Sequence, residues 1–116
     1  MALRRLKRRP DFLQVASTGQ KSAMPGLVLQ TRDRADGDGL RVGFTASRRV
    51  GGAVERNRAK RRLRAAAEQV LGLKGRAAHD HDYVLIARAE TIRRPYRLLL
   101  EDLDRALQRI DGARRR

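Results

Sequence analysis

The segment from Ala53 to Leu71 carries dense positive charge and an apolar helical stripe, and one element must satisfy both. Residues 56–64 read R-N-R-A-K-R-R-L-R, which places six cations in nine residues. Apolar residues recur at helical spacing and predict one buried face on a surface helix. They are Ala59, Leu63, Ala66, Ala67, Val70 and Leu71. The chain must therefore pack this helix on a core through a narrow stripe and leave its charges outside.

This charge is costly to the helix, because like charges at i,i+4 repel one another. A phosphate backbone would neutralise it, since displaced counterions supply most of the binding free energy. The whole chain carries a formal charge of +15, and only four of its 28 cationic residues are lysines. Arginine favours forked contacts to phosphate and stacking on bases. We therefore predict nucleic-acid binding, with an import signal or a solvated helix face as the alternatives.

Length and composition restrict the other classes. A chain of 116 residues predicts one domain spanning residues 1–116, with a modest core. The absence of cysteine excludes disulfides and thiolate metal sites, and no apolar run reaches the length of a membrane span. Residues 1–9 are basic and free of acids but lack the serines and length of a transit peptide. We expect a cytoplasmic protein with a basic lead-in and no membrane partner.

The N-terminal half predicts a short helix followed by strands. Pro10 begins the helix and Gly19 ends it, because proline and a following carboxylate suit a first turn. The residues 27–29 form a β-prone run, and the turn formers of 33–39 connect it to a strand at 40–47. The predicted apolar face of the helix comprises Phe12, Leu13, Val15 and Ala16.

The strand at 40–47 alternates cleanly between two faces. Val42, Phe44 and Ala46 point one way. The opposite set is small and polar, so that face is either open to a ligand or simply solvated. It comprises Arg41, Gly43, Thr45 and Ser47.

The C-terminal half predicts a helix, a buried strand and a helix. Gly72 and Gly75 end the first helix, and the apolar run 83–87 predicts a central strand. Pro95 starts the last helix, whose stripe comprises Tyr96, Leu99, Leu100, Leu103, Ala106, Leu107 and Ile110. Its wet side is predicted to carry Glu101, Asp102, Asp104 and Arg105. This order of elements indicates an α+β fold or a split α/β sandwich.

Groups for catalysis or metal binding are scarce. The run from His79 to Asp82 lacks a third ligand and is interpreted as a polar loop before the strand. The carboxylates within 33–38 lack the spacing of a calcium loop and suit a hairpin tip. Ser47 has no nucleophile-elbow context and no activating partner. The protein is predicted to bind rather than to catalyse, with no catalytic residue and no metal of its own.

The stretch 41–64 (R-V-G-F-T-A-S-R-R-V-G-G-A-V-E-R-N-R-A-K-R-R-L-R) resembles the protein component of bacterial ribonuclease P. That family has a strand ending in Ser and two basic residues, a glycine, Ala-Val, Arg-Asn-Arg and a basic helix. Weaker similarity covers Asp11-Phe12, the strand 82–88 and the closing helix from Tyr96.

The resemblance implies both a fold and a function. The implied fold is an α-β sandwich of order α-β-β-β-α-β-α, with a central sheet and a left-handed β-α-β crossover, an exception to the usual hand. The implied function is that of the protein subunit of ribonuclease P, which assists a catalytic RNA in removing the 5′ leader of precursor tRNA. The RNA performs the hydrolysis with its own Mg²⁺, one protein is expected per RNA, and the protein itself needs no cofactor.

The resemblance also assigns residues to two RNA sites. The catalytic RNA is expected to contact the basic helix and the two arginines before it, namely Arg48, Arg49, Arg56, Asn57, Arg58, Lys60, Arg61 and Arg64. The single-stranded leader is expected in a cleft between the first helix, the sheet and the basic helix, with stacking and charge as its two attractions. The candidates there are Phe12, Thr45, Ser47 and Arg88.

Two departures from the family pattern concern this cleft. Ala16 and Gln30 occupy positions that are often aromatic in the family. Base–aromatic stacking contributes about 1–3 kcal/mol per base, so the leader is expected to be held more by charge. The alternatives to this function are a ribosome-associated RNA binder and a protein nuclease acting alone. The lack of an active site disfavours the nuclease.

Overall fold

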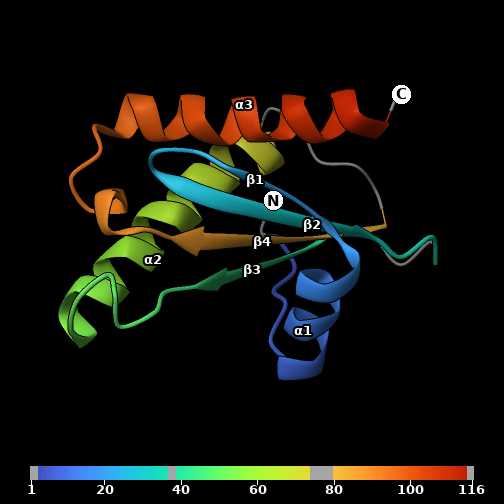
Figure 1. The fold of residues 1–116 in the computed structure, drawn as a ribbon, viewed down its shortest axis with the longest axis horizontal. Helices are drawn as coiled ribbons and strands as arrows, with labels where there is room; N and C mark the ends of the chain where they lie inside the picture. Colours follow the sequence, from blue (N-terminus) through green and yellow to red (C-terminus); the bar gives the residue numbers. More distant parts are fainter. Residues whose placement is uncertain (1–2, 37–38, 74–79, 115–116) are drawn as a thin grey trace.

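A computed structural model describes residues 3–36, 39–73 and 80–114 of the chain. Its main elements follow the predicted order α-β-β-β-α-β-α and confirm the α+β class (Figure 1). They are α1 (Arg9–Thr18), β1 (Gln20–Ala23), β2 (Leu27–Asp33), β3 (Arg41–Thr45), α2 (Ala53–Ala67), β4 (His81–Ala87) and α3 (Tyr96–Arg114). A π-helical turn, η1 (Glu68–Leu73), continues α2, and a 3₁₀ turn, η2 (Ala89–Thr91), precedes α3.

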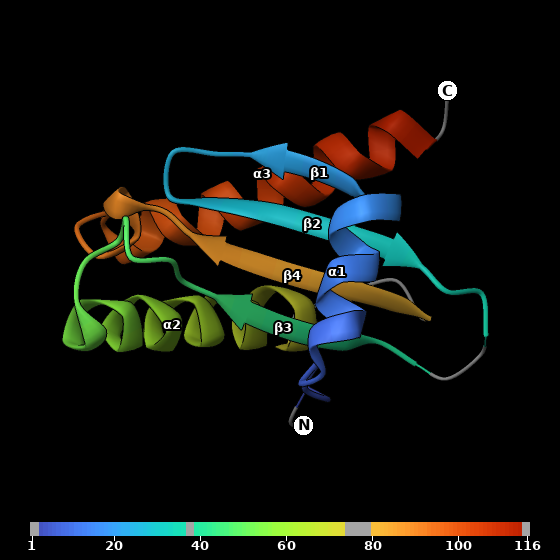
Figure 2. The same cartoon turned by 60° about the horizontal axis from the view of Figure 1, so that its bottom comes forward.

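The described strands form one mixed sheet in the order β1-β2-β4-β3. β2 pairs antiparallel with β1 and β4, and β3 runs parallel to β4. The central strand predicted at 83–87 is confirmed, and the run at 27–29 extends to Asp33. In Figure 2 the parallel strands point left, with β4 above β3 and α2 behind them, so the β3–α2–β4 crossover is left-handed.

Helices cover both faces of this sheet: α2 and α3 lie on one side and α1 on the other (Figures 1 and 2). Alternation along β4 separates the two cores. Tyr83 and Leu85 join the main core with α2 and α3, and Val84 joins a smaller core beneath α1. Because α1 is short, part of its face of the sheet stays uncovered.

The apolar stripe of α2 is confirmed, with each of its predicted members buried. The predicted end at Gly72 is wrong, because the helical turn η1 continues through this glycine to Leu73. Val70 and Leu71 are buried in the main core, and this packing holds the turn against the cost of a helical glycine, about 1 kcal/mol. Gly75 lies outside the described residues.

Two predicted helix faces need correction. In α3, Asp102 is not on the wet side but 1% exposed, since it accepts hydrogen bonds from the Arg94 guanidinium and the Gly26 N–H. A buried charge is tolerated when it is paired in this way. In α1 only Val15 is buried, whereas Leu13 is 55% exposed, so the helix contacts the sheet along one narrow line.

Candidate nucleic-acid interface

The first turns of α2 present positive charge to solvent. Asn57, Arg58 and Arg61 are exposed, and Arg56, Lys60 and Arg64 are half-buried beside the apolar stripe. Among the described residues, none of these five cations pairs with a carboxylate. Their mutual repulsion is therefore not relieved inside the protein, and an external polyanion would relieve it.

Arg62 belongs to the same run of six cations but not to this surface. Its guanidinium donates hydrogen bonds to the carbonyl oxygens of Thr91, Ile92 and Arg94, at 2.5 to 2.6 Å. The prediction that a phosphate backbone neutralises all six cations is therefore wrong for Arg62. The fold brings η2 and the residues after it to the side of α2 that Arg62 occupies.

The turn before α2 adds two exposed arginines. Arg48 and Arg49 follow β3, and the Arg49 N–H donates to the Ser47 hydroxyl at 3.3 Å. Gly52 is the N-cap of α2 and supplies no side-chain capping bond. The positive end of the helix dipole and these two cations therefore lie at the same end of α2.

Phe12 closes one end of the sheet face that was predicted to be small and polar. A Cβ at Gly43 would lie 2.5 Å from Phe12 Cε1 and 3.1 Å from Leu6 Cβ. The prediction of an open face is therefore wrong at Gly43, which is buried beneath the Phe12 ring. Only glycine permits this close approach of the Phe12 ring. The sheet face becomes accessible two residues farther on, at Thr45.

Beyond Thr45 the face opens into a groove. Thr45 pairs with Ile86 at the end of the β3–β4 ladder, and the two other predicted residues, Ser47 and Arg88, follow shortly after the ends of β3 and β4. A depression of about 420 Å³ follows, and among the residues that line it are Ser47, Arg49, Ile86 and Arg88. Arg49, which was assigned to the catalytic RNA, lies beside the leader candidates. Arg88 is exposed and donates from Nη1 to the Met24 carbonyl at 2.8 Å.

Aromatic side chains are rare on this face. The chain has two Phe, two Tyr and no Trp. Of these four aromatic residues, Phe12 alone packs with the small core beneath α1, whereas Phe44 and Tyr83 pack with the main core. Ala16 is exposed, and Gln30 is half-buried opposite Val84. Neither supplies a second stacking surface near Phe12.

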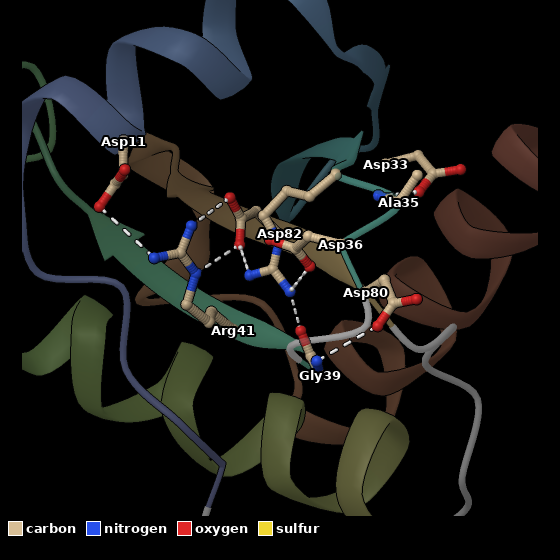
Figure 3. A network of polar contacts seen from close by, with 9 residues as sticks. Asp11, Asp33, Ala35, Asp36, Gly39, Arg41, Asp80 and Asp82 are labelled. Carbon is tan, nitrogen blue, oxygen red and sulfur yellow. Dashed lines mark hydrogen bonds and ion pairs between the residues drawn. The ribbon is translucent and has the colours of Figure 1, made fainter.

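A buried ion-pair network lies beside α1 at the start of β3 and β4, at the other end of these strands from the groove (Figure 3). Asp82 is fully buried and accepts from Arg34 Nη1 at 3.1 Å and from Arg41 at 2.8 and 2.9 Å. Arg41 also reaches Asp11 of α1 at 3.6 Å. The hydrogen bonds to Asp82 raise the pKa of Arg41 above its ordinary value. The network thus ties α1 and the β2–β3 connection to the central strand.

This network corrects the interpretation of residues 79–82 as a polar loop. His81 and Asp82 are buried residues of β4. The burial of Asp82 is possible because Arg34 and Arg41 neutralise its carboxylate. His79 lies outside the described residues. Within the described ranges no cluster of three His, Asp or Glu residues could hold a metal ion. The hairpin predicted at 33–38 is wrong, because β4 lies between β2 and β3 in the sheet. Asp33 nevertheless accepts the Ala35 N–H at 2.9 Å, as expected of a turn former.

Comparison with known proteins gives one consistent family. The family model described as Ribonuclease P matches residues 2–111. The chain is 52% identical over 112 residues to the ribonuclease P protein component of Paramagnetospirillum magneticum, covering 93% of this chain and 83% of that protein. It is 51% identical over 104 residues to the protein of the same name from Caulobacter vibrioides, covering 89% and 68%.

Solved structures agree with the sequence comparison. The RNase P protein from Thermotoga maritima superimposes with a TM-score of 0.75 at 30% identity, covering 91% of this chain and 96% of that one. The RNase P protein of Staphylococcus aureus gives 0.73 at 25% identity, covering 90% and 92%. In the described parts of this chain, no helix is both long enough and apolar enough to traverse a bilayer.

Proposed function

Because this chain belongs to the family of bacterial ribonuclease P protein components, we propose that α2 binds the catalytic RNA and that the sheet groove holds the 5′ leader of precursor tRNA. The chain is the protein subunit of ribonuclease P, an RNA-based endoribonuclease of tRNA processing. The observation that carries the proposal is the set of cations on α2 that pair with no carboxylate in the described part of the chain, close to the groove lined by Ser47, Arg49 and Arg88.

The catalytic RNA is assigned to α2 because this surface is convex, rigid and positive. The stripe of α2 is buried in the main core, so Arg58 and Arg61 project from a fixed scaffold. A rigid array of arginines matches the phosphates of a folded RNA better than a flexible tail does. Asn57 and the flanking Arg48 extend the same surface.

The leader is assigned to the groove because a single strand needs a channel and a stacking platform. Phe12 supplies the platform, and Thr45, Ser47 and Arg88 follow it along the sheet. The polar groups of Thr45 and Ser47 suit sugar and phosphate contacts that do not depend on sequence. Arg49 lines the leader groove and also lies just before α2, so it would contact both the leader and the catalytic RNA.

The protein assists the reaction by binding. In this proposal the RNA subunit hydrolyses the phosphodiester with its Mg²⁺, and the protein lowers the repulsion between two polyanions and fixes the leader. One protein acts with one RNA subunit, in the cytoplasm. Only precursor tRNA carries the leader. Leader binding would therefore raise the affinity of the enzyme for its substrate but not for mature tRNA, which favours release of the product.

Reconstitution tests this proposal. Purified protein is incubated with precursor tRNA, with and without the catalytic RNA of the same organism and Mg²⁺. We expect 5′ maturation by the RNA to be stimulated by the protein, and no cleavage by the protein alone. An absence of stimulation would indicate a ribosome-associated or other RNA binder. Cleavage by protein that has been freed of RNA would indicate a protein nuclease.

A further inference from the structure

The N-terminal segment preceding α1 carries a second concentration of cations. Residues 4–9 read R-R-L-K-R-R, with five cations in six positions, and we call this segment the N-terminal strap. All five cations are exposed, and Leu6 alone is buried. The sequence signal was visible as a basic lead-in, but nothing in it showed whether the segment was ordered.

The N-terminal strap is fixed to the body of the protein rather than trailing from it. The Leu6 N–H donates to the Val42 carbonyl and the Val42 N–H to the Arg4 carbonyl, both at 2.9 Å. This parallel bridge adds the strap to the outer edge of β3. Leu6 packs in the small core with Val15 and Val84. Terminal residues are poorly ordered unless they are tied down in this way, so the strap holds its cations in a defined place.

The N-terminal strap runs along the outer edge of β3 at the start of that strand, between the face of the sheet covered by α2 and the face covered by α1 (Figure 2). On the α2 side, the Arg5 guanidinium lies 5.2 Å from the centroid of the Phe44 ring, which packs with the main core. On the other side, the strap leads into α1 and reaches Phe12 within its first turns. The cations of the strap thus lie at the edge of the sheet, and none of them is among the residues that line the groove.

The charge of the N-terminal strap opposes helix stability. Arg8 is the N-cap of α1 and Arg9 its first residue, and no side-chain capping bond is made. Ser, Thr, Asp or Asn is preferred at an N-cap, because its side chain accepts a hydrogen bond from a free backbone N–H of the first turn. Cations are also unfavourable at the positive end of the helix dipole. Two positions at which stability favours other residues are therefore occupied by arginine.

We propose that the N-terminal strap is a second phosphate-binding surface, which contacts the backbone of the ribonuclease P RNA subunit alongside α2. The inference rests on the proposed function of α2. The RNA subunit is favoured over the leader because the strap lies outside the groove, which is the channel that a single strand needs. Five exposed cations at a fixed edge suit a folded, extended polyanion.

The test compares two triple variants that lose the same charge. K7Q/R8Q/R9Q removes three cations of the N-terminal strap, and R97Q/R105Q/R109Q removes three exposed arginines of α3, on the opposite side of the sheet from α1. The double variant R56A/R58A is the reference for α2. Affinity for the RNA subunit alone, and for precursor tRNA bound to the reconstituted enzyme, is measured across a salt titration, with thermal unfolding of each protein.

We expect the strap variant to lose affinity for the RNA subunit by about tenfold and its salt slope to fall by roughly two to three, from a slope of about 0.9 per phosphate. The α3 variant should change affinity by less than about twofold. The melting temperature of the strap variant should be unchanged or higher, because repulsion at the N-terminus of α1 is removed. Should the triple variant unfold, K7Q/R9Q repeats the comparison with the N-cap residue intact.

Two results would overturn the proposal: equal affinities of the strap and α3 variants for the RNA subunit, or a strap variant that loses only affinity for precursor tRNA. The double variant R56A/R58A distinguishes a failure of the strap inference from a failure of the proposed function. If R56A/R58A also binds the RNA subunit normally, the role of α2 is wrong. If R56A/R58A is weakened and the strap variant is not, only the strap inference fails.

Discussion

At the scale of single residues, two neighbouring arginines have different roles, one on the surface and one in holding the fold together. Arg61 is exposed and unpaired among the described residues, whereas Arg62 binds three backbone carbonyls at the start of the α3 region. Helical geometry alone separates the two by about 100°. The contribution of each arginine therefore depends on what the fold brings to its side of the helix.

Replacing these two residues should separate stability from binding. Arg62→Met should lower the free energy of unfolding by about 1–3 kcal/mol, because three carbonyls lose a charged donor. Arg61→Met should change it by less than about 0.5 kcal/mol and should weaken binding to the RNA subunit. Urea unfolding and a binding titration on the folded proteins measure both effects. Similar stability losses in the two variants would contradict the assigned roles.

At the scale of elements, one buried carboxylate organises the end of the sheet that lies opposite the groove. Asp82 of β4 holds Arg34 from the β2–β3 connection and Arg41 from β3, and Arg41 in turn reaches Asp11 of α1. These contacts set where α1 crosses the sheet and hence where Phe12 covers Gly43. The position of the stacking platform thus depends on a residue that touches no RNA in the proposed function.

Asp82→Asn should destabilise the protein by about 3–5 kcal/mol, because two buried arginine contacts lose their counter-charge. Asp11→Asn is the matched control, since its ion pair is longer and partly exposed, and it should cost no more than about 1 kcal/mol. Chemical denaturation measures both variants. The network does not have the proposed importance if Asp82→Asn is no more destabilising than Asp11→Asn.

At the scale of the whole molecule, charge outweighs stacking. The chain carries +15, yet Phe12 is the single aromatic among its four that packs on the groove side of the sheet. Ala16 and Gln30 add no ring beside it. The groove and the surfaces around it therefore attract RNA mainly through long-range and phosphate contacts, which salt screens.

Binding of the leader by the reconstituted enzyme should accordingly depend steeply on salt. The affinity difference between precursor and mature tRNA isolates the leader, and it should shrink as monovalent salt rises, because few contacts other than phosphate contacts remain. Equilibrium titrations of both substrates at several salt concentrations measure this. A leader contribution that hardly changes with salt would show that stacking on Phe12 dominates instead.

Local patterns in the sequence predicted α1, the strands at 27–29, 40–47 and 83–87, the apolar stripes of α2 and α3, and the cationic run from Arg56 to Arg64, but not β1. Periodicity and charge density are properties of neighbouring residues, so they can be interpreted without knowing what lies across the fold. Tertiary structure alone decided that Arg62 binds distant backbone carbonyls, that Asp82 and Asp102 are buried, that Gly43 is covered, and that the N-terminal strap is ordered. Each depends on a partner far away in the sequence, and burying a charge is possible only where such a partner neutralises it.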